Sequence, residues 1–316
     1  QGLKTIRNTD GARNSHMDAP ELMISLDGEP QETTGRVIAA ILCWSGNYEL
    51  RINTTGHRQH QFYAGIDPMS SEYVLEPNEL FETPHLALAY SEDGLGGASR
   101  TIHRWARTEG MFHRGMKTGD ILLNSWEGVV FDIKEETMIN MMDDIAKFGG
   151  ELFVMDDGWF GDKYPRNNDS SSLGDWVVDK RKLPGGISTL TQAARQRGIK
   201  FGIWIEPEMC NTVSELYEKH PDWMLQTKGR ELKQGRGGTQ VVLDLTNPKV
   251  QDFIFGIVDN LMTQNPDIAY IKWDANASIQ SYGSLYLPKD KQNNISILWH
   301  RGLINVLKRI RAKYPD

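Results

Sequence analysis

The sequence predicts an α/β fold, a (β/α)8 TIM-type barrel preceded by antiparallel β-structure. The first indication is a change of pattern near residue 115, from short alternating apolar runs to a repeat of strand, loop and helix. The second is a set of polar residues at the predicted carboxyl ends of the strands, where a barrel carries its active site. The third is that no glycine-rich phosphate loop follows the first strand, which ends in Asn124-Ser125-Trp126-Glu127.

Residues 1–115 are predicted to form antiparallel β-structure. Val, Ile, Tyr and Phe are frequent in short alternating runs, and Asn, Gly and Pro separate the runs. Residues 97–114 have a helical pattern, and we expect them to connect this region to the next one. The predicted runs cover residues 35–44, 48–53, 59–66, 73–75 and 85–90.

Residues 116–316 contain five predicted strands, each followed by helical sequence, which indicates a parallel sheet with right-handed crossovers. Asn247 and Pro248 are typical of a helix start, and the helix after them has apolar residues at helical spacing. The predicted strands are residues 121–126, 151–156, 200–206, 240–245 and 269–274, and the main helices are residues 135–148, 188–197, 250–262 and 293–313.

Five strands are fewer than the eight of a closed barrel. We therefore expect the sequence to be a piece of a longer protein that holds only the first five βα units, and a first residue Gln1 rather than Met fits this expectation. In a barrel the five strands lie parallel and adjacent in chain order. An open doubly wound sheet is the alternative, and it would place the first strand in the middle.

Composition and charge exclude several classes of protein. The formal net charge of −7 provides no basic surplus for phosphates, so we expect no nucleic-acid partner. The longest apolar runs are about eight residues, such as residues 37–44, whereas a membrane helix needs about 20. Cys43 and Cys210 supply neither a disulfide framework nor metal-ligand spacing. We expect a soluble protein, and the sequence leaves open whether it works in the cytoplasm, the periplasm or outside a bacterium.

Charged residues lie at three of the predicted strand ends. Asp156 and Asp157 follow the second strand, Glu206 the third, and Lys272 and Asp274 the fifth. Because residues i and i+2 of a strand share a face, Lys272 and Asp274 point in the same direction. Charges at the inner rim of a barrel are costly to bury unless they are paired or used. We therefore expect Asp156, Glu206 and Asp274 to share one site.

Two kinds of chemistry fit carboxylates at a barrel rim. A glycosidase needs two carboxyl groups at the scissile bond, and it also needs groups that bind the sugar hydroxyls. A Mg²⁺ site of the enolase type would gather three carboxylates, but the fourth strand offers only Asp244, which also fits a structural role in capping a helix. Trp rings stack on sugar rings, and five Trp near strand ends favour the sugar: Trp126, Trp159, Trp176, Trp204 and Trp273.

Several motifs resemble those of family 36 glycoside hydrolases, the large microbial α-galactosidases. The resemblance runs through nearly the whole chain in the correct order. The motifs are Asn124-Ser125-Trp126-Glu127, the run LFVMDDGWFG at residues 152–161, Leu173-Gly174-Asp175-Trp176, Trp204-Ile205-Glu206-Pro207-Glu208-Met209, His220-Pro221-Asp222-Trp223 and Lys272-Trp273-Asp274.

The resemblance implies a domain plan and an activity. Residues 1–115 would be the C-terminal part of an N-terminal β-supersandwich with its linker, and residues 116–316 the N-terminal portion of the catalytic barrel. The implied activity is retaining hydrolysis of terminal α-linked galactose in oligosaccharides or glycoconjugates, without metal or cofactor. The implied partner is the α-galactoside substrate, with no nucleic acid and no membrane, and homo-oligomerisation is left open.

The resemblance also implies residue roles. Asp274 matches the family's nucleophile, and Asp156 and Asp157 match the residues that hold galactose hydroxyls. The ammonium of Lys272 beside Asp274 favours the ionised carboxylate that a nucleophile requires. Further substrate contacts are predicted at Trp126, Trp159, Trp204, Lys272, Asn276 and Arg236.

Three features depart from the family pattern. Asn276 is flanked by two Ala residues where the family has Met and Arg. Gly238-Thr239-Gln240 stands where the family has an Arg before the fourth strand, and Arg236 is the candidate replacement. The family's acid/base Asp follows a later glycine-rich segment, so we expect it beyond Asp316. Alternatives are an α-N-acetylgalactosaminidase, a galactosyl transferase of the raffinose-synthase kind, and, from another class, a catalytically silent sugar-binding barrel.

Overall fold

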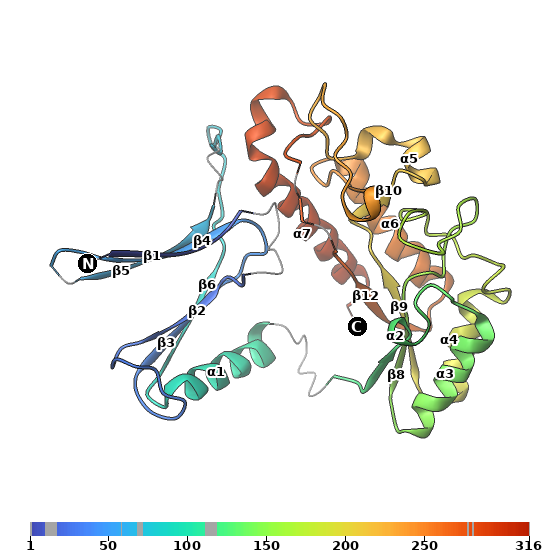
Figure 1. Cartoon of the computed structure of the whole chain (residues 1–316), viewed down its shortest axis with the longest axis horizontal. Coiled ribbons are helices and arrows are strands. Elements are labelled where there is room, and N and C mark those ends of the chain that lie inside the picture. The colour runs from blue at the N-terminus through green and yellow to red at the C-terminus, as the bar shows by residue number, and fades with distance from the viewer. Residues whose placement is uncertain are drawn as a thin grey trace. The chain divides into compact units, whose positions relative to one another are not determined.

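A computed structural model of the chain describes residues 2–9, 18–57, 59–67, 72–110, 119–276, 278–279 and 281–315. The chain divides into two compact units, Gln1–Gly119 and Asp120–Asp316, which are coloured blue to cyan and green to red in Figure 1. None of the helices in the described part of the chain combines the length and apolarity needed to cross a membrane.

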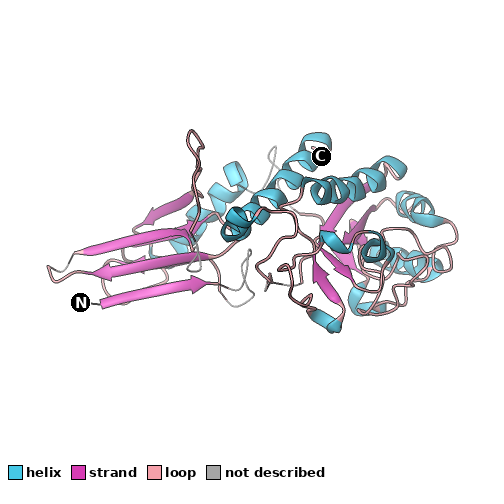
Figure 2. Ribbon diagram, turned by 90° about the horizontal axis from the view of Figure 1, so that it is seen from above, coloured by secondary structure: helices cyan, strands magenta, loops and turns pink. Residues whose placement is uncertain are grey.

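The first unit contains two antiparallel sheets of three strands each. One has the order β1-β4-β5 and the other β2-β3-β6, and their strands are drawn in magenta in Figure 2. In β3, Val37 and Ala39 face one small core, and Leu42 on the opposite face packs into a second core with Tyr48 and Leu50. The strands are β1 (Gly2–Asn8), β2 (Glu21–Ser25), β3 (Val37–Leu42), β4 (Tyr48–Thr54), β5 (His60–Ile66) and β6 (Leu86–Ser91).

A helix, α1 (Gly94–Trp105), packs on β3 and β6, and a short π-helix (Ala106–Gly110) follows it. Ala98 of α1 lies in a small core with Val37, Ala39 and Ala89. A Cβ atom at Gly97 would collide with Ser91 Oγ, so glycine lets the helix approach the sheet this closely.

The prediction for the first unit is partly right. The sequence pattern found β3 to β6 but missed β1 and β2, and the predicted run at residues 73–75 is not a strand. That run packs Tyr73 edge-on against Phe81 within a loop, so its aromatic composition serves local packing instead of a ladder. The predicted helix at 97–114 begins earlier, and its last four residues lie outside the described residues.

The second unit is built on a parallel sheet with the order β7-β8-β9-β12, as expected for part of a barrel. All residues of β8 are buried, which is typical of a parallel strand covered on both faces. β8 pairs with β7 from Leu122↔Leu152 to Asn124↔Val154 and with β9 from Leu152↔Lys200 to Met155↔Ile203. The strands are β7 (Leu122–Asn124), β8 (Leu152–Met155), β9 (Lys200–Ile205) and β12 (Ile268–Trp273).

The predicted fourth strand is wrong as a member of this sheet. Among the described residues, β12 pairs directly with β9, and β11 (Gln240–Val242) instead pairs antiparallel with β10 (Met209–Asn211). Leu243 N–H then donates to the carbonyl of Glu208, and the indole of Trp299 holds the carbonyl of Leu243. The apolar, Val-rich composition of residues 240–245 predicts a strand but does not select its partner.

Helices cover the sheet of the second unit. α3 packs on β8 and α4 packs on β9, and α6 and α7 pack against each other. α6 begins as predicted, because the Asn247 side chain accepts the N–H of Lys249 and Pro248 occupies the first turn. The helices are α2 (Trp126–Val129), α3 (Glu135–Lys147), α4 (Gly186–Gln196), α5 (Glu215–Lys219), α6 (Pro248–Gln264) and α7 (Ile295–Lys313).

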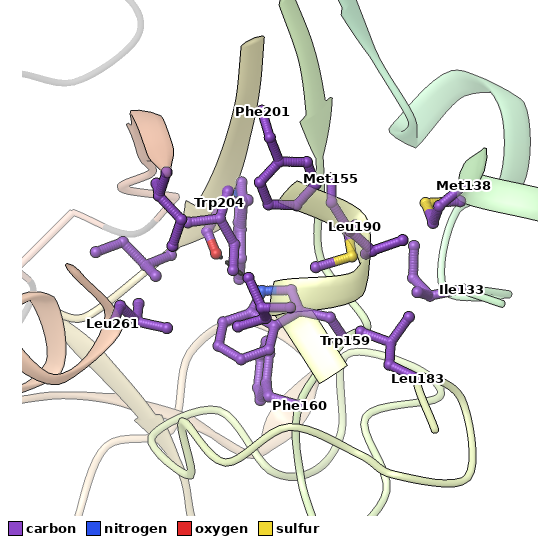
Figure 3. Packing of buried hydrophobic residues seen from close by; sticks show 14 of the residues in the cluster. Ile133, Met138, Met155, Trp159, Phe160, Leu183, Leu190, Phe201, Trp204 and Leu261 are labelled. Atoms are coloured by element: carbon purple, nitrogen blue, oxygen red, sulfur yellow. Dashed lines mark hydrogen bonds between the residues drawn. The ribbon is translucent and has the colours of Figure 1, made fainter. Parts of the chain in front are cut away.

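A large apolar core fills the space between sheet and helices (Figure 3). It joins Phe201 of β9 and Met155 of β8 with Met138 of α3 and Leu190 of α4. Trp159 lies inside this core, fully buried and edge-on to Phe160. Packing in this core therefore holds the carboxyl end of β8 in place, together with the start of the loop that follows it.

Candidate active site

Four neighbouring strands end at one edge of the parallel sheet and place polar residues there. Asn124 is the last residue of β7, and Asp156, Glu206 and Asp274 directly follow β8, β9 and β12. Hydrogen bonds join Asn124 to Asp156 and, separately, join Glu206 to Asp274 through Asn276. The predicted meeting of carboxylates from separate strands therefore occurs in the structure.

Asp156 is buried, and its carboxylate accepts three hydrogen bonds. Its Oδ2 accepts from Asn124 Nδ2 at 2.6 Å and from Lys272 Nζ at 2.7 Å, and its Oδ1 accepts the backbone N–H of Asp157 at 2.9 Å. Its own N–H donates to Ser125 Oγ. Lys272 therefore binds Asp156, whereas the sequence analysis paired it with Asp274.

Asp157 is clamped by a residue that the sequence analysis missed, Arg166. The guanidinium is fully buried and donates from Nε to Oδ1 at 2.9 Å and from Nη2 to Oδ2 at 2.7 Å. Its Nη1 donates to the carbonyl of Ser171 and to Asn211 Oδ1. Burial raises the pKa of the Asp157 carboxyl above its ordinary value, and Arg166 opposes that shift. Arg166 stands in a polar loop without strand or helix periodicity, so no sequence signal marked it.

Asp274 is the least buried carboxylate of the group. Its Oδ2 accepts from Trp204 Nε1 at 3.0 Å and from Asn276 Nδ2 at 2.7 Å, and its Oδ1 accepts the N–H of Ala275 at 2.9 Å. Partial burial alone would raise the pKa of Asp274, but these hydrogen bonds and the charge of Lys272 outweigh it and hold the pKa below its ordinary value. Asp274 is thus kept as an anion within reach of solvent.

Glu206 is almost fully buried next to Asp274 in the register of the two strands. Its Oε1 accepts the backbone N–H of Asn276 at 2.7 Å, whereas its Oε2 has no hydrogen-bond partner in the described part of the chain. Burial raises the pKa of Glu206 to about 7, with Asp274 adding to the shift and Asn276 opposing it. The pKa values of two neighbouring carboxyl groups are thus shifted in opposite directions.

The predicted Trp residues take different positions. Trp204 is buried and holds Asp274 through its indole N–H. Trp159 is buried in the core and donates to the carbonyl of Trp204, so the structure does not present it to a ligand. Trp126 is the first residue of α2, half-buried and edge-on to Phe131. Trp273 donates to Glu208 Oε1 at 2.8 Å.

Arg236 and Asn276 border one small pocket of about 190 Å³. Arg236 Nη2 lies 3.6 Å from Asp169 Oδ2, and the other oxygen of Asp169 lies 3.3 Å from Arg166 Nη2. Asp169 therefore connects Arg236 to the clamp on Asp157. A larger pocket of about 950 Å³ is lined from α4, α5 and α6 and from the loop that carries Asp175 and Trp176.

Asp244 takes a structural role, which was one of the two readings of this residue. Its Oδ1 accepts from the N–H of Thr246 at 3.0 Å, and its carboxylate also accepts from the hydroxyls of Thr246 and Ser284. Within the described ranges, no group of three or more His, Cys, Asp or Glu side chains is placed to hold a metal ion.

Comparison with known proteins identifies two families along the chain. Residues 80–316 match the Melibiase family, and residues 1–76 match the glycosyl hydrolase family 36 N-terminal domain.

Curated relatives match along nearly the entire chain. It is 36% identical to alpha-galactosidase AgaA of Geobacillus stearothermophilus over 99% of its residues and 42% of AgaA. It is 34% identical to alpha-galactosidase Mel36A of Lactobacillus acidophilus over 100% of its residues and 42% of Mel36A. The chain thus spans about 42% of the length of these relatives.

Solved structures agree with the fold. The crystal structure of AgaA, a GH36 alpha-galactosidase, has a TM-score of 0.93 at 35% identity and covers 99% of this chain and 43% of its own. Variants of AgaA have been solved in complex with stachyose and with raffinose. The fold predicted from the sequence, part of a barrel preceded by antiparallel β-structure, is confirmed by this similarity.

Proposed function

This chain belongs to glycosyl hydrolase family 36, the melibiase family, as its motifs predict, and we propose that the protein containing it is a retaining α-galactosidase. It removes terminal α-linked galactose from oligosaccharides or glycoconjugates by double displacement, with Asp274 as the nucleophile. The activity of the relatives and the binding of stachyose and raffinose by AgaA variants support this substrate class.

The observation that carries the proposal is the state of Asp274. A nucleophilic carboxylate must be ionised and partly accessible, and Asp274 has a lowered pKa and is only half-buried. Its Oδ2 accepts two hydrogen bonds and its Oδ1 accepts one, so Oδ1 has the freer lone pairs. We assign the attack on the anomeric carbon to Oδ1, with Trp204 and Asn276 holding Oδ2.

Substrate contacts surround this carboxylate. Lys272 binds Asp156 with one of its three N–H donors and is partly exposed, so the others are free to donate to sugar hydroxyls. Asp156 and Asp157 accept further hydrogen bonds from sugar hydroxyls at the rim, and Arg166 opposes the rise in the pKa of Asp157 that burial causes. Trp126, Trp204, Asn276 and Arg236 are further proposed contacts, and Trp159 is left out because it lies in the core.

The second carboxyl group of a retaining mechanism stands roughly 5–5.5 Å from the nucleophile and serves as acid and then as base. Among the described residues, Asp156 and Asp157 are committed to other bonds, and Glu206 is too buried to reach a leaving group. We therefore propose that this group comes from outside these 316 residues.

We also propose a domain assignment. Residues 1–115 are the C-terminal part of a β-supersandwich with its linker, and residues 116–316 are the N-terminal portion of the catalytic barrel. Two observations support two parts with a connector between them. The family matches divide between residues 76 and 80, and the compact units divide at Gly119.

The test replaces Asp274 in the protein that contains this chain. Asp274→Asn is expected to abolish release of galactose from a chromogenic α-galactoside but to leave galactose binding largely intact, because the amide keeps the shape and cannot form the glycosyl ester. Added azide is expected to restore turnover through a galactosyl azide. Asp252→Asn, at an exposed carboxylate on α6, is the matched control and should keep full activity.

Two results would contradict the proposal. One is near-normal turnover by the Asp274→Asn variant. The other is a wild-type protein that hydrolyses the α-N-acetylgalactosaminide but not the α-galactoside, which would move the substrate class to that alternative.

A further inference from the structure

Glu206 is a buried carboxyl group to which the proposed mechanism gives no task. It follows β9 directly, and β9 pairs with β12 through Lys272↔Trp204 and Trp273↔Ile205. The next position in that register sets Glu206 beside Asp274, and the N–H of Asp274 donates to the carbonyl of Ile205. The two carboxyl groups therefore stand at equivalent ends of adjacent strands.

Asn276 connects the two carboxyl groups. Its backbone N–H donates to Glu206 Oε1 at 2.7 Å, and its side-chain Nδ2 donates to Asp274 Oδ2 at 2.7 Å. Glu206 thus fixes the backbone of Asn276, and Asn276 in turn fixes the orientation of the Asp274 carboxylate. Without the acceptor at Glu206, that backbone amide would be left without this bond and residues 274–276 would lose an anchor.

The free oxygen of Glu206 indicates which protonation state this arrangement suits. Oε2 is buried and has no hydrogen-bond partner among the described residues, a condition that is costly for an ionised carboxylate. The charged groups that act on Glu206 from neighbouring strands are Asp274, after β12, and Asp157, after β8, and both are negative. Burial and these charges raise the pKa of Glu206 to about 7, so it is protonated in acidic solution and loses its proton as the pH rises through about 7.

Ionisation of Glu206 would disturb the nucleophile. An anion at Glu206 would attract the donors nearest to it, and Asn276 already contributes a side-chain interaction with Glu206 besides its backbone one. Any donor drawn to Glu206 is withdrawn from Asp274 Oδ2. The two roles of Asn276 would then compete.

We propose that Glu206 is a positioning residue for the nucleophile, which in its protonated form orients Asp274 through Asn276. This inference rests on the proposed α-galactosidase function. Glu206 touches neither the sugar nor the reacting bond. It acts by keeping both donors of Asn276 in their places.

The test is the pH dependence of kcat/KM with α-galactosyl fluoride in the protein that contains this chain. Fluoride leaves without a proton from a general acid, so the profile reports attack by Asp274 and not the state of the acid/base group. For wild type, kcat/KM should fall above pH 7, by about tenfold per pH unit if only the protonated form attacks. Glu206→Gln keeps a neutral acceptor, so it should retain activity at pH 6 within about threefold and lose the fall above pH 7.

Two further variants separate positioning from a general structural effect. Glu206→Ala removes the acceptor and should lower kcat/KM by about 10² at every pH, since a displaced reacting group costs about that much. Glu208 is a second buried carboxylate shortly after β9, and it accepts a hydrogen bond from the indole of Trp273. Glu208→Gln should therefore keep the shape of the wild-type pH profile of kcat/KM.

The outcomes also distinguish this inference from the proposed function. A wild-type protein with no activity on any α-galactoside overturns both. An active wild type with a Glu206→Gln variant that keeps the same fall above pH 7 overturns the positioning role alone. If Glu206→Ala fails to fold, the comparison of Glu206→Gln with Glu208→Gln still decides the question.

Discussion

The buried ion pair between Arg166 and Asp157 offers a sharp test of how this site is held together. The Arg166 side chain is 1% exposed and that of Asp157 is 6% exposed. Replacing Arg166 with Met fills a similar volume but leaves the Asp157 carboxylate without its two guanidinium bonds. The carbonyl of Ser171 and Asn211 Oδ1 also lose a donor.

Breaking one side of such a pair typically costs about 3–5 kcal/mol, because an uncompensated charge stays buried. The geometry supports the upper part of that range, since the guanidinium binds both carboxylate oxygens within 3.2 Å. For a domain of this size the cost corresponds to a fall in Tm of about 2–4 °C per kcal/mol. We expect Arg166→Met to lower the Tm by about 10 °C at pH 7.

The cost should depend on pH with a definite sign. Burial already raises the folded-state pKa of Asp157 above its ordinary value, and loss of Arg166 raises it further. A raised folded-state pKa means that stability is full below the unfolded-state pKa and is lost as the pH rises through the folded-state value. The penalty of Arg166→Met should therefore shrink at pH 4 and grow toward pH 8.

The assay is thermal or denaturant unfolding of wild type and variant between pH 4 and pH 8. Arg195→Met is the control, because Arg195 forms an exposed pair with Asp267 and should cost no more than about 1 kcal/mol. Removing both charges, with Arg166→Met and Asp157→Leu together, should cost less than Arg166→Met alone. A penalty below about 1 kcal/mol, or one that does not change with pH, would refute this account of the pair.

Three further predictions concern stability and the site. The pKa of Glu206 rises from 4.5 to about 7 on folding, so wild type loses about 3 kcal/mol of stability as the pH rises from 4 to 8. Glu206→Gln cannot ionise and should gain that amount relative to wild type over the same range, which thermal unfolding at several pH values will measure. Gly302→Ala in α7 should lower the free energy of unfolding by about 1–3 kcal/mol, because a Cβ there would collide with the carbonyl of Leu245. In the control Gly256→Ala in α6 the new Cβ meets no neighbour, so this variant should be more stable than wild type by about 0.5–1 kcal/mol. Asp175→Ala should lower the free energy of unfolding by about 1–2 kcal/mol, because the Asp175 carboxylate accepts the N–H groups of Glu215 and Leu216 at the start of α5. Denaturant unfolding measures this, and an unchanged free energy of unfolding would show that the cap is unimportant.

The sequence by itself determined the four strands of the parallel sheet and the residues that stand at their carboxyl ends. The two-residue period of a strand places Lys272 and Asp274 on one face, and the structure brings both into the same polar network. The motifs at residues 152–161 and 272–274 were enough to identify the family, which the comparisons confirm. These signals are local, so they survive without knowledge of the tertiary structure.

The tertiary structure alone decided how those strand ends are connected. Lys272 and Asp156 are 116 residues apart in the sequence, and Trp204 and Asp274 are 70 residues apart. Strand or helix periodicity gives no information about contacts over such separations. The same reason explains the errors. The run at residues 240–245 had a strand pattern but found its partner in β10, and Trp159 had the position of a ligand platform but filled the core. Arg166 stands in an irregular loop, and only the folded chain shows that its guanidinium neutralises Asp157, because a buried charge requires a partner that local sequence does not specify.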